Sequence, residues 1–390
     1  MNVLPFPIFV GKDLMKYSNM VIHEKGDSFW FYDEPDKSYS LAEMNGKFVF
    51  MLDDANNTRT MNEEVQRLLD KYPEVVKSNG EYGRTDVLSH HIQLESTVPV
   101  QIRPMYYPPN FTKEIRSQIG KLLKEGRIWP STSPYSANVV LAPKKDGKLR
   151  MTVSYKKINA ITVPDAIPIH KGQQILRNIP PKGYYSKIDL KSGFWQIGMD
   201  GASIPKTAFQ FDGQLYEFLV MPFGLKNSTA TFVRLMNKVL EGTIGKYTYV
   251  YVDDIIIYSP TFEDHMKHIE DVLIRLKKAG LTINTEKSLF AQTELDFLGH
   301  RITAKGVTMQ EEKVKAIRDW PVPRSKSDLH RFIGTCGWYR EFIEDYATLA
   351  EPLTKLLGKN KPFIWNETHM DVFNRLKTRM CEGPILKTIN

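Results

Sequence analysis

Apolar residues recur three and four positions apart in several stretches of the chain, a spacing typical of helices with one buried face. The stretches that predict a helix in this way are residues 60–72, 112–127, 228–240 and 262–279. Gly126 and Gly280 lie where the second and the fourth of these helices are expected to end, because glycine is favoured just after a helix. The pattern is tightest from about residue 98 onward.

Other stretches are rich in β-branched and aromatic residues, which favours strands. They comprise residues 29–32, 48–52, 137–142, 150–155, 184–190 and 247–258. Residues 137–142 and 150–155 flank the turn signal Asp146-Gly147, so we expect a hairpin with lysines near its tip. Such a tip could contact a phosphate, although composition alone favours an ordinary solvated turn.

Composition is that of a globular protein and suggests the charge of its partner. Of the 390 residues, 42% are hydrophobic and 25% are charged, which is typical of globular proteins. The net charge of +8 favours a polyanionic partner without identifying one. Cys336 and Cys381 are the two cysteines of the sequence, so a disulfide framework is not expected and a reducing compartment is. No window approaches the roughly 18 apolar residues of a spanning helix, and we expect a soluble intracellular protein without membrane contact.

Metal sites built from cysteine or histidine are not expected. The two cysteines lie outside any Cys-x-x-Cys pattern. The pair His90-His91 is isolated in the sequence and is expected in a surface loop.

Two adjacent aspartates, Asp253 and Asp254, interrupt the strand-like run 247–258. Aspartate disfavours strands and is costly to bury unless it is paired or bound to a cation. We therefore expect a tight hairpin that presents both carboxylates to a hard cation such as Mg²⁺, with Asp189 at the end of 184–190 as a third ligand. Three carboxylates around two cations suit in-line phosphoryl displacement. A plain turn is the alternative, since aspartate is common in turns.

Several short motifs follow one another along the chain. Each motif alone is weak evidence, but their order and spacing together are characteristic of one protein family. After the basic hairpin and Arg150 they are Lys187–Leu190, Lys206–Phe209, Met221–Leu225, Tyr251–Asp254, Phe297–His300 and Arg331–Gly334 with Tyr339 and Phe342. In this order the sequence resembles reverse transcriptases from about Val98 to Leu386. Residues 221–225 and 297–300 are most similar to the polymerase of gypsy-type LTR retrotransposons.

The resemblance implies an α+β fold of the right-hand polymerase type with fingers, palm and thumb, in which helices pack on an antiparallel palm sheet. It also implies a nucleotidyltransferase, an RNA-directed DNA polymerase that extends a primer on an RNA or DNA template. Its substrates would be dNTPs and its cofactor two Mg²⁺ ions, with Mn²⁺ as a substitute. A catalytically inactive nucleic-acid-binding remnant is one alternative, and a metal-dependent nuclease that uses the same carboxylates is another.

Individual roles follow from the same resemblance. Asp189, Asp253 and Asp254 match the metal-binding aspartates of the palm. Lys287 falls at the position of a candidate general acid for the leaving pyrophosphate, with a solvated lysine as the alternative. The other matched positions are Lys144 and Arg150 for the triphosphate, Phe194 for exclusion of a ribose 2′-hydroxyl, Phe223 and Gly224 for the floor of the nucleotide pocket, and Phe297, Leu298, Gly299 and His300 for the primer terminus.

The resemblance also divides the chain. Residues 4–13 resemble the end of a retroviral-type aspartic protease, whose Asp-Thr/Ser-Gly triplet is missing from this sequence. The expected parts are residues 1–20 as a protease remnant, 21–97 as a linker of unknown structure, 98–300 as fingers and palm, 301–345 as thumb, and 346–390 as the start of a connection towards an absent RNase H domain. We therefore expect a segment of a longer polyprotein, located in the cytoplasm or within virus-like particles, with dimerisation left open.

Four positions depart from the usual pattern of the family. Ser154 stands where aspartate is usual, Lys156 replaces an arginine, Trp195 a histidine and Ser288 a cysteine. The acid missing at position 154 is expected to weaken nucleotide binding or local stability without abolishing chemistry. The three palm aspartates and the pocket floor are intact, which favours an active enzyme.

Overall fold

The computed structural model describes most of the chain after residue 60 and short stretches before it. The described residues are 20–22, 28–31, 34–40, 61–76, 82–143, 147, 149–168, 172–181, 183–304, 306–343, 345–359 and 361–381. The chain divides into two units, Met1–Leu68 and Leu69–Asn390. Lys144, the protease-like residues 4–13, the strand expected at 48–52 and the last residues, 382–390, lie outside the described residues.

The first unit contains a small antiparallel sheet. Its strands, in spatial order, are β1 (Met20–Ile22), β2 (Ser28–Phe31) and β3 (Glu34–Ser40). β2 corresponds to the strand expected at residues 29–32. Residues 61–70 are helical, which agrees with the helix expected at 60–72.

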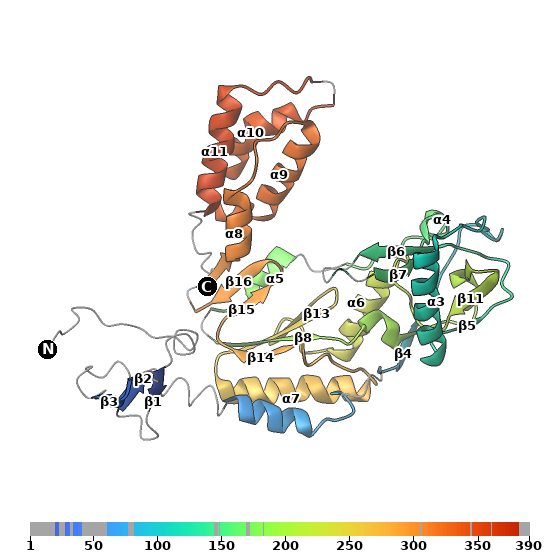
Figure 1. Cartoon of the computed structure of the whole chain (residues 1–390), viewed down its shortest axis with the longest axis horizontal. Coiled ribbons are helices and arrows are strands. Elements are labelled where there is room, and N and C mark those ends of the chain that lie inside the picture. The colour runs from blue at the N-terminus through green and yellow to red at the C-terminus, as the bar shows by residue number, and fades with distance from the viewer. Residues whose placement is uncertain are drawn as a thin grey trace. The chain divides into compact units, whose positions relative to one another are not determined.

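A four-stranded antiparallel sheet forms the middle of the second unit (Figure 1). Its strands, in spatial order, are β12 (Thr248–Tyr251), β13 (Asp254–Ser259), β8 (Tyr184–Asp189) and β14 (Leu289–Gln292). α7 (Phe262–Lys278) packs on β8 and β13, and α6 (Ser228–Val239) packs on β12. Ile255, Ile256 and Ile257 are all buried, so consecutive positions of β13 are apolar instead of alternating. The expected antiparallel sheet packed by helices is confirmed.

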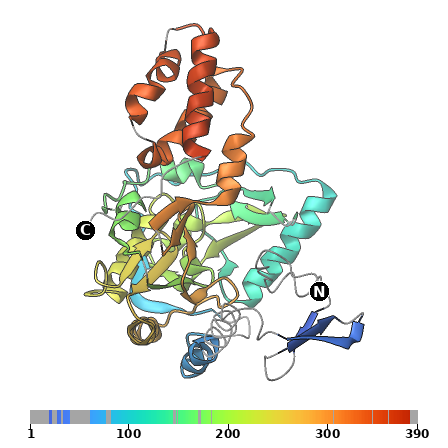
Figure 2. The ribbon, with the colours of Figure 1, turned by 90° about the vertical axis from the view of Figure 1, so that its left-hand side faces the viewer.

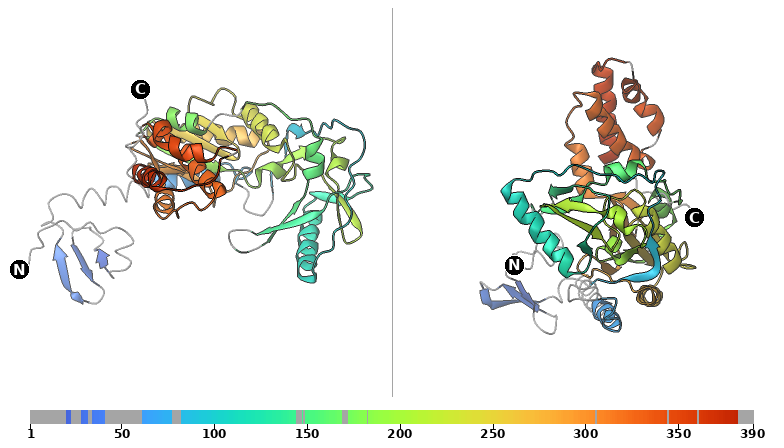
Figure 3. Two further views of the ribbon diagram at one scale, coloured as in Figure 1. Left: turned by 90° about the horizontal axis from the view of Figure 1, so that it is seen from above. Right: turned by 90° about the vertical axis from the view of Figure 1, so that its right-hand side faces the viewer.

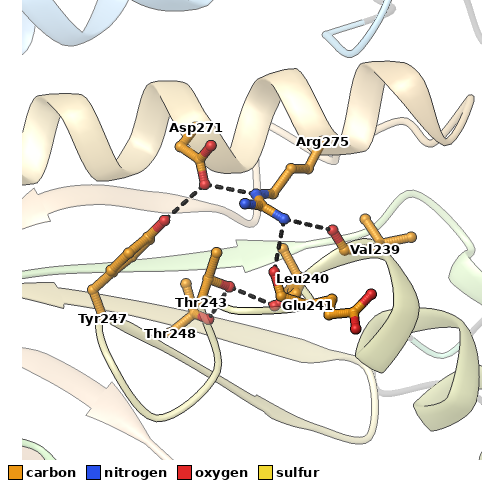
Figure 4. A network of polar contacts seen from close by, with 8 residues as sticks. All are labelled: Val239, Leu240, Glu241, Thr243, Tyr247, Thr248, Asp271 and Arg275. Atoms are coloured by element: carbon orange, nitrogen blue, oxygen red, sulfur yellow. Dashed lines mark hydrogen bonds and ion pairs between the residues drawn. The ribbon is translucent and has the colours of Figure 1, made fainter.

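A polar network ties α7 to the beginning of β12 (Figure 4). The Tyr247 hydroxyl donates to Oδ2 of Asp271 at 2.7 Å, and Nε of Arg275 donates to the same oxygen at 2.7 Å. Arg275 also donates from Nη1 to the carbonyl oxygen of Glu241 at 2.9 Å. Because β12 leads directly into the aspartate hairpin, these contacts anchor the hairpin from its far end.

The fingers elements, the long helix α3 among them, lie to one side of this sheet (Figure 3). They are α3 (Pro109–Lys124), β5 (Ile128–Pro130), the hairpin β6 (Val139–Pro143) and β7 (Leu149–Val153), α4 (Lys156–Ala160), β10 (Phe209–Phe211) and β11 (Gln214–Phe218). The hairpin expected around Asp146-Gly147 is present, and Gly147 has a φ of 77°. α3 begins at Pro109, before the predicted start at residue 112, because Pro108 and Pro109 suit a helix start. It ends at Lys124, before the predicted end at residue 127, and Gly126 follows with a φ of 63°.

The segment before the fingers is part of the second unit. β4 (Thr85–His90) pairs in parallel with β9 (Ile197–Met199), so residues assigned by expectation to a linker form a strand. The expectation of a surface loop at His90-His91 is wrong for His90, which is 1% exposed and contacts Oγ1 of Thr231 through Nδ1 at 2.8 Å. Burial lowers the pKa of His90 to about 4, so the ring is neutral at pH 7.

The C-terminal part is a small sheet followed by a group of helices, which stand together in Figure 2. Its elements are β15 (Leu295–Phe297), β16 (His300–Thr303), β17 (Gly306–Met309), α8 (Glu311–Arg318), α9 (Lys326–Trp338), η4 (Arg340–Phe342), α10 (Tyr346–Leu356) and α11 (Glu367–Cys381). The remaining short helices are α5 (Gly172–Asn178), η2 (Gly193–Gln196) and η3 (Ile204–Thr207). Among the helices of the described ranges, none has the length and apolar character needed to cross a membrane.

Candidate active site

The aspartate hairpin brings three carboxylates to one edge of the central sheet. β12 and β13 are joined by the two residues Val252 and Asp253. Asp254 pairs with Tyr251 across this hairpin and with Asp189 on the neighbouring strand β8. The tight hairpin predicted from the sequence is present, and Asp189, Asp253 and Asp254 lie together at the strand ends.

The hairpin adopts an unusual backbone conformation. Val252 has a φ of 53°, in the left-handed region that a β-branched residue rarely adopts. Such conformations cluster at functional sites, where the surrounding structure holds them in place. Val252 thereby turns the chain within two residues, and Asp253 follows it at the tip.

The charge of Asp253 is poorly compensated. Burial, and then the charges of Asp254 and Asp189, raise the pKa of Asp253 to about 6. Its Oδ1 is buried and has no hydrogen-bond partner among the described residues. Burial also raises the pKa of Asp189, with Lys287 opposing the shift and Asp254 adding to it. An unpaired buried carboxylate oxygen in a cluster of negative charge fits a bound cation.

The third carboxylate is engaged by a lysine. Oδ2 of Asp254 lies 2.9 Å from Nζ of Lys187, the residue two positions before Asp189. Within the described ranges, no three acidic, histidine or cysteine side chains are grouped as ready metal ligands. The carboxylate oxygens of Asp189 and Asp253 can still serve as ligands of a divalent cation, because among the described residues neither is paired with a lysine as Asp254 is. Asp254 could bind the metal only after its ion pair with Lys187 is broken.

Asp189 is positioned by the loop that follows α7. Its backbone N–H donates to Oγ of Ser288 at 3.1 Å, and its carbonyl oxygen accepts the N–H of Asn284 at 2.7 Å. Oγ of Ser288 in turn donates to the carbonyl oxygen of Asn284 at 2.7 Å. Ser288, a departure from the family pattern, thus holds the end of β8 in place. The sequence carries no local signal for this role, because the contact spans about a hundred residues.

A large cleft opens beside the cluster, with a volume of about 970 Å³. It joins five of the residues expected at the site, which are Arg150, Asp189, Phe223, Asp253 and Lys287. Its basic residues come from both sides: Lys121 and Arg150 from the fingers, Lys191 and Lys287 from the palm. Glu114 and Glu125 also line the cleft, on the side of α3. A cleft that joins Asp189 and Asp253 to several cations can hold metal ions and a polyphosphate together.

The floor of the cleft is aromatic. The guanidinium carbon of Arg150 lies 5.3 Å from the ring centroid of Phe223, within cation–π range. Phe194 lies beneath, with ring centroids 5.4 Å from Phe223 and 5.6 Å from Phe232. Phe194 is 9% exposed and is not among the residues that line the cleft, so it contacts the floor from below.

Other expected residues lie outside this cleft. Gly224 has a φ of 93°, and its carbonyl oxygen accepts a hydrogen bond from Nδ2 of Asn159 at 2.8 Å. The expected primer-terminus residues form the turn between β15 and β16, in which Phe297 pairs with His300 and Gly299 accepts a hydrogen bond from the Tyr339 hydroxyl at 2.9 Å. Leu298 and Gly299 have φ values of 51° and 77°, as a two-residue hairpin turn requires.

Sequence reasoning missed one group at the wall of the cleft. Tyr82 and Trp195 line the cleft, and the guanidinium of Arg127 lies between their rings. Tyr82 belongs to the expected linker, and Arg127 was predicted as the last residue of a helix. Trp195 stands where the family pattern has histidine, which gives no sign of this contact. The three residues are distant in sequence, so no local pattern could have joined them.

Comparison with known proteins agrees with this geometry. Residues 142–302 match the family model described as reverse transcriptase (RNA-dependent DNA polymerase). The chain is 35% identical over 403 residues to the retrovirus-related Pol polyprotein from transposon opus of Drosophila melanogaster, an alignment covering 99% of this chain and 40% of that polyprotein. It is 35% identical over 291 residues to the corresponding polyprotein from transposon gypsy, covering 70% of this chain and 28% of that one. The chain thus spans well under half the length of these curated relatives.

Solved structures show the same fold. The foamy viral protease–reverse transcriptase in complex with double-stranded DNA has a TM-score of 0.78 at 26% identity, covering 85% of this chain and 59% of that one. The foamy viral protease–reverse transcriptase in complex with an RNA/DNA hybrid has a TM-score of 0.74 at 26% identity, covering 84% and 45%. The right-hand polymerase fold expected from the sequence is confirmed. The chain therefore belongs to the reverse transcriptase family and is a segment related to the Pol polyproteins of gypsy-type LTR retrotransposons.

Proposed function

We propose that the second unit is an RNA-directed DNA polymerase, a nucleotidyltransferase that extends a primer on an RNA or DNA template with dNTPs. The observation that carries the proposal is the single cleft that joins Asp189 and Asp253 to Arg150, Lys287 and Phe223. This reaction requires three kinds of group: carboxylates that bind cations, a forked guanidinium that binds phosphate, and an aromatic floor on which a nucleotide can lie. The proposed setting is intracellular.

The aspartates of the cleft are proposed to bind metal ions and its basic residues to bind the triphosphate. Asp189 and Asp253 would hold two divalent cations, Mg²⁺ or in its place Mn²⁺, and Asp254 would join them after releasing Lys187. When bound, such ions activate the attacking hydroxyl and stabilise the leaving oxygen. Arg150 can bind triphosphate oxygens through parallel N–H donors, and Lys144 is proposed to bind them as a point charge.

Lys287 and Phe194 have separate proposed roles. Lys287 lies in the cleft close enough to influence the pKa of Asp189, and its ammonium group can give a proton to the departing pyrophosphate. Phe194 supports the ring of Phe223 from below. The position of Phe223 in turn determines how much space the pocket leaves for a ribose 2′-hydroxyl. Residues 297–300 are proposed to hold the primer terminus from the side of α9.

Primer extension tests the proposal directly. The parent chain is expected to lengthen a labelled DNA primer on an RNA template when dNTPs and Mg²⁺ are present. Two other outcomes would replace the proposal. Shortening of the template without dNTP incorporation would indicate a nuclease, and duplex binding without any extension would indicate an inactive remnant.

Duplex binding should depend steeply on salt. The foamy viral relatives were solved with double-stranded DNA and with an RNA/DNA hybrid, which supports a primer–template as the partner of this chain. If the chain neutralises six or more phosphates, its affinity is expected to fall by roughly three orders of magnitude between about 50 and 200 mM salt. A gel-shift titration measures this fall, with the melting temperature over the same salt range as the control for folding. A flat dependence would argue against a duplex held by phosphate contacts.

A further inference from the structure

A buried arginine sits between two aromatic rings at the edge of the cleft. The guanidinium carbon of Arg127 lies 3.6 Å from the ring centroid of Tyr82 and 4.0 Å from that of Trp195. Arg127 is 4% exposed, and its Nε lies 2.8 Å from Oε2 of Glu125. Planar guanidinium groups stack well on ring faces, and burial strengthens the attraction.

The arrangement is costly for stability. By geometry, neither Nη1 nor Nη2 of Arg127 forms a hydrogen bond among the described residues, and the same holds for Nε1 of Trp195, although the Tyr82 side chain lies close enough to oppose the lowering of the pKa of Arg127. Burial, opposed by the charge of Glu125, lowers the pKa of Arg127. An apolar side chain of similar length would fill the same space without leaving donors unsatisfied. Packing alone therefore does not account for a guanidinium at this position.

The stack continues to the floor of the nucleotide pocket. The ring of Trp195 lies 5.7 Å from that of Phe223, and Phe223 lies 5.3 Å from the guanidinium carbon of Arg150. Tyr82, Arg127, Trp195, Phe223 and Arg150 thus form one continuous series of contacts, in which two rings, Trp195 and Phe223, lie between the two arginines. All of them except Arg127 line the cleft. A shift of the Arg127 plane would be passed to Phe223 through a single ring.

The outer end of this series is fixed by close packing. The N–H of Gly83 donates to Oγ1 of Thr282 at 3.0 Å. A Cβ at position 83 would collide with the carbonyl oxygen of Gly280 and with Oε1 of Gln196. Gln196 Nε2 in turn donates to the carbonyl oxygen of Thr282 at 2.8 Å. The chain next to Tyr82 is therefore held against the palm, and Tyr82 gives the series a rigid end.

We propose that Arg127 is a positioning residue for the incoming nucleotide. Arg127 stacks on Tyr82 and holds the ring of Trp195 against Phe223. The inference deepens the proposed polymerase function and rests on it. It assigns a part in nucleotide selection to Tyr82, a residue that precedes the fingers. Arg127 itself touches neither the reacting atoms nor the surface of the cleft.

Replacement of the arginine should separate stability from nucleotide binding. For Arg127→Met the KM for dNTPs is expected to rise about tenfold while kcat changes less than about twofold, because methionine fills the space but does not hold one ring orientation. The melting temperature should stay equal or rise, since buried unsatisfied donors are removed. Arg127→Lys keeps the charge without the planar stack and should not restore the KM. Arg116→Met, the same change at an exposed arginine of α3, serves as the matched control and should leave the KM unchanged.

A second variant guards against a folding defect. Tyr82→Leu removes the outer ring and should raise the KM for dNTPs as Arg127→Met does, and the double variant should add little to either single change. An unchanged KM in both single variants overturns the inference, and so does a rise in KM that is matched by a loss of melting temperature. dNTP binding to a complex with a chain-terminated primer gives the same comparison without turnover. A parent chain that binds dNTPs there yet never extends a primer would overturn the proposed function and leave this inference testable.

Discussion

Asp253→Asn is expected to abolish primer extension and to make the metal-free protein more stable. Loss of one cation ligand removes several kcal/mol of transition-state stabilisation, so the rate should fall by about a thousandfold or more. The same change removes a carboxylate whose pKa is raised to about 6 by burial and by Asp254 and Asp189. Its ionised form costs the metal-free fold about 1–2 kcal/mol at neutral pH, after allowance for solvent screening.

The gain in stability should depend on pH in a defined direction. The native state holds the proton of Asp253 more tightly than the unfolded state, so the stability of the metal-free parent falls as pH rises from about 4 to about 6. Asp253→Asn lacks this loss. Its melting temperature in EDTA should therefore equal that of the parent near pH 4 and exceed it by a few degrees at pH 7.

The matched control is Asp296→Asn, which makes the same change at an exposed position on β15. It should leave both extension and melting temperature unaltered. Duplex binding by Asp253→Asn should stay within about twofold of the parent, since the carboxylate repels phosphate more than it binds it. Extension by Asp253→Asn at the parental rate would refute the role of the hairpin.

Phe194→Val is expected to let the enzyme incorporate ribonucleotides. Phe194 supports Phe223 from below, and a smaller side chain lets the floor drop and makes room for a 2′-hydroxyl. Discrimination between dNTPs and ribonucleotides should fall on the order of a hundredfold, the scale that steric fit at one position can supply. Single-nucleotide extension with each substrate measures the ratio of their kcat/KM values. Valine is preferable to alanine here, because Phe194 is buried and alanine would leave a larger cavity.

Phe232→Leu controls for general loosening of the palm. Phe232 on α6 is fully buried and lies on the other side of Phe194, 5.6 Å from it. Both variants should lose stability, by about 1–3 kcal/mol. Only Phe194→Val should change the discrimination ratio. An unchanged ratio for Phe194→Val, measured in a folded protein, would remove the gate assignment from this residue.

Local patterns predicted the parts of the site that lie within one short stretch of chain. The run 247–258 contains both strands of the hairpin and the acids between them, so its turn could be expected without knowledge of the rest of the fold. α7 could be predicted equally well from its apolar periodicity and from Gly280, which follows it with a φ of 68°. The structure adds a cap at its start, where Thr261 accepts the N–H of Asp264. Asp189 could be expected as a further acid at the end of a strand-like run, and the family resemblance agreed, although Asp189 lies opposite Asp254 only after folding.

Contacts between distant segments could not be predicted in this way. Arg127 follows a helical pattern in the sequence, yet α3 ends at Lys124 and Gly126, with a φ of 63°, turns the chain away. Where Arg127 then goes depends on rings contributed by residues 82 and 195. The burial of His90 follows likewise from the pairing of β4 with β9, a parallel contact across more than a hundred residues. Such contacts are set by tertiary packing, and the residues themselves show no periodic signal.

The pairing of β4 with β9 has a consequence for proteolytic processing. Residues 85–90 pair with β9, and Gly83 packs against Gly280 and Gln196, so this stretch belongs to the polymerase in structure although it precedes the recognisable fingers. A protease that cut between residues 90 and 98 would separate β4, and with it Tyr82 of the Arg127 stack, from the rest of the second unit. If the proposed polymerase function and the proposed role of Tyr82 hold, we expect a cleavage site that releases this polymerase from a polyprotein to lie upstream of Tyr82.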